Sequence, residues 1–171
     1  MKKILWILAI VGGFSFSACS EQTEINEFES GNWKARNEAY IDSLALVARA
    51  NQGSAVGQWK VLQSFHLSSN LSSLDNQDYV YAKILKVGDG EVSPLFTDSV
   101  VVNYCGKLIP TKAYPKGYIF DQNFYGDIED EENQKIMVPT TFCVGALVDG
   151  WTTSLQKMHV GDIWRLYIPQ S

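Results

Sequence analysis

Residues 139–169 decide the fold of this chain, because a predicted strand and a predicted short helix follow one another there. The stretch opens with Pro139-Thr140-Thr141-Phe142-Cys143-Val144 and continues with Leu147-Val148-Asp149-Gly150-Trp151. β-Branched and aromatic residues predict a strand over Val138–Val144. Apolar residues at helical spacing predict a short helix over Gly150–Met158, with Trp151, Leu155 and Met158 on one face.

Further strands are predicted on both sides of this stretch. Tyr79–Val87 has a strand pattern, and Gly88-Asp89-Gly90 after it reads as a hairpin turn. Ser99–Leu108 is a strong strand candidate, and Ile163–Ile168 follows a turn at Val160-Gly161-Asp162. The intervening segments are a loop at Pro110–Gly117, an extended stretch at Tyr118–Phe120 and a long acidic loop at Tyr125–Gln134. Residues 79–171 therefore predict an α+β domain of antiparallel strands with one short helix.

Residues 1–18 have the pattern of a signal peptide. Lys2 and Lys3 precede the apolar run Ile4–Phe16, and Ser17-Ala18 stand before Cys19. The run is short for a membrane span, so we expect cleavage before Cys19. A small residue before Cys resembles a bacterial lipobox, which predicts a diacylglycerol-type lipid (palmitate among its acyl chains) on the Cys19 thiol. An ordinary secretory signal with an incidental cysteine is the alternative.

Residues 19–78 predict a lipidated tether followed by a helical extension. Ser20–Gly31 is acidic and polar, which is typical of a tether. Asn32 can cap a helix that runs to about Ala50. The expected apolar stripe of this helix is Trp33, Arg36 through its stem, Tyr40, Leu44 and Val47. Trp59–Phe65 alternates enough for a short strand, and Leu67–Asp78 reads as a loop.

Composition and charge exclude some classes of protein. The 171 residues are enough for one domain plus a short addition. A formal net charge of −5 argues against a nucleic-acid partner. If Cys19 carries lipid, Cys105 and Cys143 remain, and both are expected to face outward because each follows an inward residue. A disulfide between them is chemically possible in an oxidising envelope, and two free thiols are the default.

Several blocks of residues 79–171 resemble an FKBP-type peptidyl-prolyl isomerase domain in order and spacing. They are Tyr81–Gly90, Val100-Val101-Val102-Asn103-Tyr104-Cys105-Gly106-Lys107-Leu108, Gly117-Tyr118-Ile119-Phe120-Asp121, and the run from Pro139 to Pro169. The last run is similar to bacterial envelope members of the family without a gap. The resemblance implies an antiparallel sheet wrapped on one short helix, and isomerisation of X-Pro bonds without a metal or cofactor.

The resemblance also implies which residues would form the site. The aromatic residues are Trp151 under the proline ring, with Tyr104, Phe120 and Phe142 as walls. Leu147 and Val148 would form the rim, and the backbone N–H of Val148 would bind a substrate carbonyl. Asp121 would be the acidic residue of the pocket, hydrogen-bonded to Tyr104. Without the resemblance, the same aromatic residues read as ordinary core.

Two features depart from the family pattern. In the family, a Tyr that contacts the substrate carbonyl and a final strand follow the segment corresponding to Ile168-Pro169. That strand would lie between Ile163–Ile168 and Val100–Leu108 but would follow Ser171, so the chain is expected to be C-terminally truncated. The loop over residues 122–137 is also longer than usual and acidic. Counted from Asp121 its acidic residues fall at positions like those of a calcium-binding loop, but a solvated acidic loop without metal is the favoured interpretation.

The sequence thus predicts a bacterial envelope lipoprotein, held at the outer membrane on its periplasmic or surface side. Its isomerase domain would act on proline-containing polypeptides and assist the folding of exported proteins. An aromatic pocket with few polar groups suits this reaction, because desolvation disfavours the charge-separated planar amide. The alternatives are a non-catalytic binding or chaperone lipoprotein of the same fold, or an inactive fragment.

Overall fold

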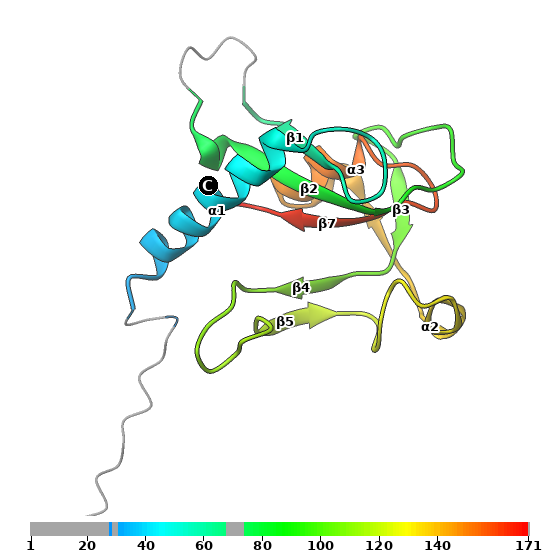
Figure 1. Cartoon of the computed structure of the whole chain (residues 1–171). Helices are drawn as coiled ribbons and strands as arrows, with labels where there is room; N and C mark the ends of the chain where they lie inside the picture. The colour runs from blue at the N-terminus through cyan, green and yellow to red at the C-terminus, as the bar shows by residue number, and fades with distance from the viewer. Residues whose placement is uncertain (1–27, 29–30, 68–73, 171) are drawn as a thin grey trace, which may run out of the picture.

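The computed structural model of the chain describes Phe28, residues 31–67 and residues 74–170 (Figure 1). The predicted signal peptide, the predicted lipidation site Cys19 and most of the predicted tether lie outside the described residues. In the part that is described, no helix is long and apolar enough to cross a membrane. The elements follow in the order α1 (Trp33–Ala50), β1 (Trp59–Gln63), η1 (Asn76–Asp78), β2 (Tyr79–Lys86), β3 (Ser99–Val102), β4 (Cys105–Lys107), β5 (Ile119–Gln122), α2 (Glu131–Ile136), β6 (Thr140–Cys143), η2 (Val144–Ala146), α3 (Asp149–Leu155) and β7 (Ile163–Tyr167).

Three antiparallel sheets make up the β structure of the described residues, which confirms the predicted α+β class. β2 lies at the centre of a sheet of order β1–β2–β7, while β3 pairs with β6 and β4 pairs with β5. In Figure 1, α1 crosses one face of the β1–β2–β7 sheet and α3 lies behind the other face. Successive residues of a strand point to opposite faces. Val80, Tyr81 and Ala82 of β2 are all buried because both faces are covered.

The helix α1 has the predicted bounds but packs through a different stripe. Its buried residues Ile41, Ala45 and Ala48 form a core with Trp59 and Tyr81 of the sheet. The predicted stripe of Tyr40, Leu44 and Val47 is one position out of step, which is a rotation of about 100° around the helix axis. The helix turns its alanines toward the sheet, and their small side chains leave room for the large rings of the sheet. Leu44 packs at the margin of the core and Val47 is exposed.

The chain also differs from the predicted pattern at three local points. Asn32 makes no capping bond with its side chain, and its φ of 57° places it in the left-handed region. Gly88–Gly90 does not close a hairpin, because β2 pairs with β1 and β7, and the N–H of Gly88 donates to the Asp162 carboxylate instead. The predicted strand Ser99–Leu108 is broken into β3 and β4, since the two halves pair with different partners.

The acidic insertion between β5 and β6 is not a continuous loop, because it contains α2. The Asp130 carboxylate caps α2 by accepting from the N–H of Glu132 at 2.9 Å. Asp127 accepts from the N–H of Glu129 at 2.9 Å in the same way. These carboxylates therefore serve as local caps. Among the residues that the structure describes, no three or more His, Cys, Asp or Glu side chains are grouped so that they could hold a metal ion.

The two cysteines of the domain are free thiols that lie on strands of different ladders. Cys105 opens β4 and Cys143 closes β6. Cys143 is exposed, as predicted, whereas Cys105 is half-buried and donates to the Gln122 side chain at 3.5 Å. The default of two free thiols is confirmed.

Candidate active site

Three predicted site residues bring their rings together although they come from different elements. Tyr104 lies between β3 and β4, Phe142 lies on β6, and Trp151 lies in the first turn of α3. The Tyr104 ring centroid is 5.4 Å from that of Trp151 and 5.7 Å from that of Phe142, and the Phe142 and Trp151 centroids are 5.9 Å apart. All three pairs are edge-to-face, the geometry that aromatic quadrupoles favour. The half-buried rings form an aromatic corner, named here the ring cluster.

The predicted bond between Tyr104 and Asp121 is present. The phenol of Tyr104 donates to the Asp121 carboxylate over 2.7 Å. This bond, with a smaller contribution from desolvation and the carboxylate charge, raises the pKa of the Tyr104 phenol above its ordinary value of 10.0. Tyr104 is therefore a neutral phenol at physiological pH, fixed at one side of the ring cluster by a carboxylate.

Local bonds set the orientation of α3, which carries Trp151. The hydroxyl of Thr152 donates to Val144 O at 2.8 Å, and that of Ser154 donates to Gly150 O at 2.8 Å. Both hydroxyls are buried, so an unmade bond there would cost desolvation free energy. Gly150 lacks a side chain where the Ile168 side chain packs against the helix. The first turn of α3 is thus held against η2 and the segment after β7.

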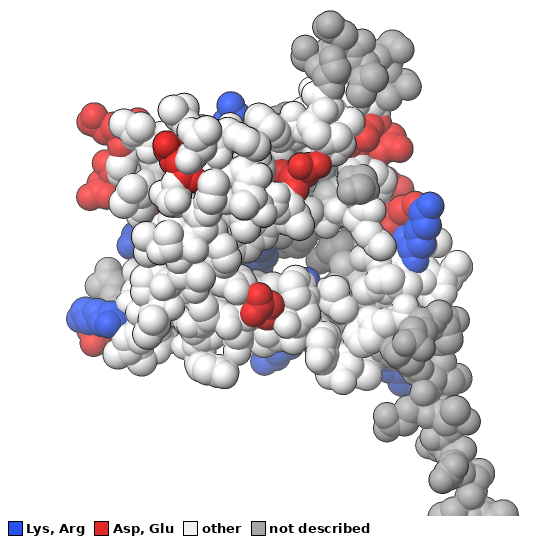
Figure 2. All heavy atoms as spheres, turned by 180° about the vertical axis from the view of Figure 1, so that it is seen from behind, with Lys and Arg blue, Asp and Glu red and all other residues white. Residues whose placement is uncertain are grey.

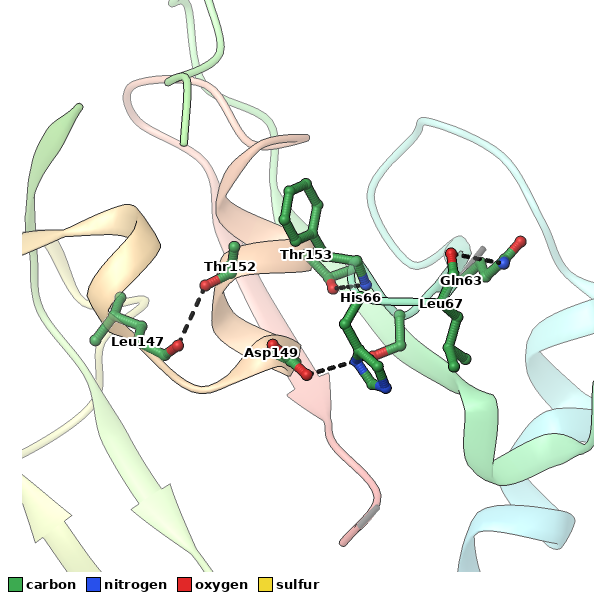
Figure 3. Close-up of polar contacts among 9 residues, drawn as sticks. Gln63, His66, Leu67, Leu147, Asp149, Thr152 and Thr153 are labelled. Carbon is green, nitrogen blue, oxygen red and sulfur yellow. Dashed lines mark hydrogen bonds and ion pairs between the residues drawn. The ribbon is translucent and has the colours of Figure 1, made fainter. Parts of the chain in front are cut away.

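The segment after β1 also contacts α3 (Figure 3). The N–H of Phe65 donates to Thr153 Oγ1 at 2.8 Å. His66 Nδ1 lies 2.5 Å from a carboxylate oxygen of Asp149, the first residue of α3. Residues before the predicted domain boundary at residue 79 therefore contact the helix that carries Trp151.

The predicted rim lies at the N-terminus of α3. Val148 precedes the helix, its side chain is 66% exposed, and its carbonyl accepts from the N–H groups of Trp151 and Thr152. In the described segments, no loop or capping hydrogen bond is donated by the N–H of Val148. Leu147 is half-buried beside it.

A cavity of about 500 Å³ opens beside the rim, and the ring cluster does not line it. Its walls come from the start of β2, the N-terminus of α3 and the segment after β7, and include Gln77, Tyr79, Val148, Gly150 and Pro169. Both rim residues, Leu147 and Val148, line this cavity.

Phe120 lies apart from the ring cluster. The β4–β5 ladder pairs Gly106 with Asp121 and Lys107 with Ile119, so Phe120 is the extra residue of a β-bulge. Its side chain is 60% exposed and its ring covers Gly106, where any added Cβ would collide with the ring. The role of Phe120 as a pocket wall stays a prediction.

The side of the molecule that carries α3 is largely uncharged. α3 lies behind the sheet in Figure 1, so Figure 2, seen from behind, presents this side. Figure 2 shows mainly uncharged residues there, with few Lys, Arg, Asp and Glu side chains among them.

Sequence reasoning missed one polar residue at the ring cluster, Asn123. Its side chain accepts from the N–H of Tyr104 at 2.8 Å. The available signal was its position two residues after Asp121, because residues at that spacing on an extended segment lie on the same side.

Comparison with known proteins matches residues 90–171 to the family of FKBP-type peptidyl-prolyl cis-trans isomerases. The chain is 34% identical over 87 residues to the peptidyl-prolyl cis-trans isomerase Mip of Coxiella burnetii, covering 51% of this chain and 30% of that protein. It is 34% identical over 117 residues to the chloroplastic isomerase FKBP17-1 of Arabidopsis thaliana, covering 65% and 47% of the two chains. It is 33% identical over 87 residues to the outer membrane protein MIP of Legionella longbeachae, covering 51% and 30%.

Residues 90–171 are therefore similar to the FKBP-type isomerases, the same family that the sequence motifs resemble. The chain spans less than half the length of each of these relatives.

Proposed function

We propose that this protein is a peptidyl-prolyl cis-trans isomerase that acts on X-Pro bonds of exported polypeptides. The observation that carries the proposal is the ring cluster of Tyr104, Phe142 and Trp151, which lies inside the family-matched segment and is tied by Tyr104 to Asp121. The three rings offer apolar surfaces, and the hydrogen bond from Tyr104 to Asp121 is the polar contact that fixes one of them. No nucleophile or proton transfer is needed for rotation about an amide bond.

The site lowers a barrier that comes from amide resonance. Rotation about an X-Pro bond in water faces about 18–20 kcal/mol and takes tens to hundreds of seconds. The planar amide is more charge-separated than the twisted one, so an apolar pocket disfavours the ground state. Trp151 forms the floor under the proline ring, Tyr104 and Phe142 form the walls, and Leu147 and Val148 form the rim. Phe120 extends the walls from its separate position on the β4–β5 ladder. The backbone N–H of Val148 holds a substrate carbonyl.

The N-terminal sequence supports a location of the proposed enzyme in the bacterial envelope. The Lys-Lys start, the short apolar run and Ser17-Ala18-Cys19 support processing and lipidation at Cys19. The relative in Legionella longbeachae is named an outer membrane protein, which supports the same location for this chain. The clients are then proline-containing proteins that fold after export.

A second function, holding unfolded polypeptides without isomerising them, is favoured by a specific observation. Phe120, Val138 and Val148 are large apolar side chains that stay exposed at or beside the site. Exposed apolar patches are typical of surfaces that bind other chains. A chaperone of this kind would suppress aggregation of a client protein even when every X-Pro bond of the client is already trans.

The test is relaxation of a peptide with one X-Pro bond from a cis-enriched state, with and without the protein. We expect the full chain to accelerate relaxation, and Trp151→Ala to lose far more of this activity than Trp33→Ala. Trp33 is the matched control, because it is also a half-buried tryptophan but lies in α1. Losing either ring can cost about 3–5 kcal/mol of stability, so both variants are compared as folded proteins by circular dichroism. Equal activity of folded Trp151→Ala and wild type would remove the ring cluster from the mechanism.

A further inference from the structure

Asn123 follows β5 directly, and its side chain lies where three other strand ends meet. The N–H of Tyr104 donates to Asn123 Oδ1 at 2.8 Å. Asn123 Nδ2 donates to Val102 O at 3.0 Å, to Thr140 Oγ1 at 3.1 Å and to Val138 O at 3.3 Å. The backbone N–H of Asn123 also donates to Tyr104 O at 3.2 Å. One half-buried residue thus ties the end of β5 to the end of β3, the start of β6 and the residue before β4.

The chemistry of these partners allows one orientation of the amide. A backbone N–H can only donate, so Tyr104 must face the side-chain oxygen of Asn123. The carbonyls of Val102 and Val138 can only accept, so they must face the side-chain nitrogen. Aspartate would lose the donor, alanine would lose donor and acceptor, and glutamine is one methylene longer. The position therefore requires asparagine for chemical reasons.

This arrangement holds Tyr104 from β5 at two points. Asp121 and Asn123 are two residues apart on an extended segment, so their side chains lie on the same side. Asp121 accepts from the phenol of Tyr104, while Asn123 binds both backbone polar groups of the same residue. Since the Tyr104 ring contacts Phe142 and Trp151 edge to face, a shift of its backbone would shift one wall of the ring cluster.

We infer that Asn123 is a positioning residue of the proposed isomerase site, which sets the Tyr104 ring against Phe142 and Trp151 by joining the ends of β3, β4 and β6 to β5. The consequence for activity rests on the proposed function. The positioning itself is a property of the fold and can be measured without substrate.

The experiment titrates the full chain and its Asn123→Ala variant to alkaline pH while the ultraviolet absorbance of tyrosinate is recorded. A Tyr104→Phe variant identifies the contribution of Tyr104 among the eight tyrosines. In Asn123→Ala we expect Tyr104 to ionise at lower pH than in wild type, because its bond to Asp121 is weakened. We also expect kcat/KM for isomerisation of the peptide to fall about 10- to 100-fold, because a displaced Tyr104 ring would no longer hold the substrate in the reactive geometry.

The matched control is Asn133→Ala, which should equal wild type in both measurements. The Asn133 side chain bonds to Asp127 O and the Asp130 carboxylate, both in its own insertion. A folded Asn123→Ala protein with an unchanged Tyr104 titration overturns the inference.

One further measurement keeps the inference testable if Asn123→Ala does not fold. In the unmodified chain the Tyr104 amide should exchange slowly with solvent, and exchange as fast as an unpaired amide also overturns it. If wild type fails to isomerise X-Pro bonds, the proposed function falls while the titration still decides the role of Asn123.

Discussion

The bond between Tyr104 and Asp121 makes the site sensitive to alkaline pH. The pKa of the Tyr104 phenol is raised above 10.0 in the folded state, so the bond contributes stability that is fully present below about pH 10. That contribution is lost as the pH rises through the raised pKa. We expect Asp121→Asn to bring the pKa of Tyr104 back toward its ordinary value, because the hydrogen bond to the carboxylate is gone, and with it the carboxylate charge. Tyrosinate absorbance during alkaline titration measures the change.

The same variant gives a second check in chemical denaturation. Wild type should exceed Asp121→Asn in stability at neutral pH, and the difference should shrink above about pH 10 as Tyr104 ionises. Tyr104→Phe is the control, because it removes the titrating group and should abolish this pH dependence. A difference that is constant across the alkaline range would mean that the bond contributes nothing to folding.

Cys19 is the residue that decides where the protein resides. We expect Cys19→Ser to accumulate as an unprocessed or soluble form, because the thiol that would carry the lipid is missing. Membrane fractionation and labelling with a radioactive fatty acid compare the variant with wild type. Cys143→Ser is a suitable control, since this exposed thiol lies in the folded domain. Unchanged labelling and fractionation of Cys19→Ser would refute lipidation at this position.

At the residue scale, motifs predicted contacts that depend on side-chain type but not contacts made through the backbone. The bond from Tyr104 to Asp121 was predicted from the resemblance, and the structure confirms it. Asn123 escaped prediction because three of its partners are backbone groups, whose positions depend on which strands pair.

At the scale of elements, α3 is held by segments that lie far apart in the sequence. The hydroxyl of Thr153 is buried and accepts from the N–H of Phe65, whereas His66 and Asp149 are about half exposed. Removing the acceptor for a part-buried donor costs about 1–3 kcal/mol, while an exposed ion pair is worth about 0–1 kcal/mol. We therefore expect Thr153→Val to lower stability more than His66→Ala. Urea denaturation of the two variants ranks them, and the opposite order would show that the ion pair, not the buried bond, holds α3.

The positions of the elements could be predicted where the hydrophobic period was clear. Which strands pair with one another could not be predicted. β2, β6 and β7 lie close to the predicted strands because their apolar patterns are strong. The break between β3 and β4 was missed because Ser99–Leu108 is continuous in pattern, while its two halves pair with different strands. The predicted buried stripe of α1 was wrong by one position, because it was drawn through the larger apolar side chains. The sheet presents large rings, and the small alanines of α1 pack against them.

For the whole molecule, the three sheets leave open edges in the described residues. β7 pairs only with β2, and β3 pairs only with β6, so each keeps one edge without a strand. We therefore propose that these open edges limit the stability of the domain.

The proposal predicts how a protein comprising residues 20–171 behaves. Unpaired strand edges are templates for aggregation, and a small domain has only about 5–15 kcal/mol of net stability to lose. We expect a broad melt at low temperature that changes with protein concentration, because chains associate through the open edges of β7 and β3. Calorimetry at several protein concentrations measures the change. A sharp two-state melt that is independent of concentration would show that these open edges do not limit the stability of the domain.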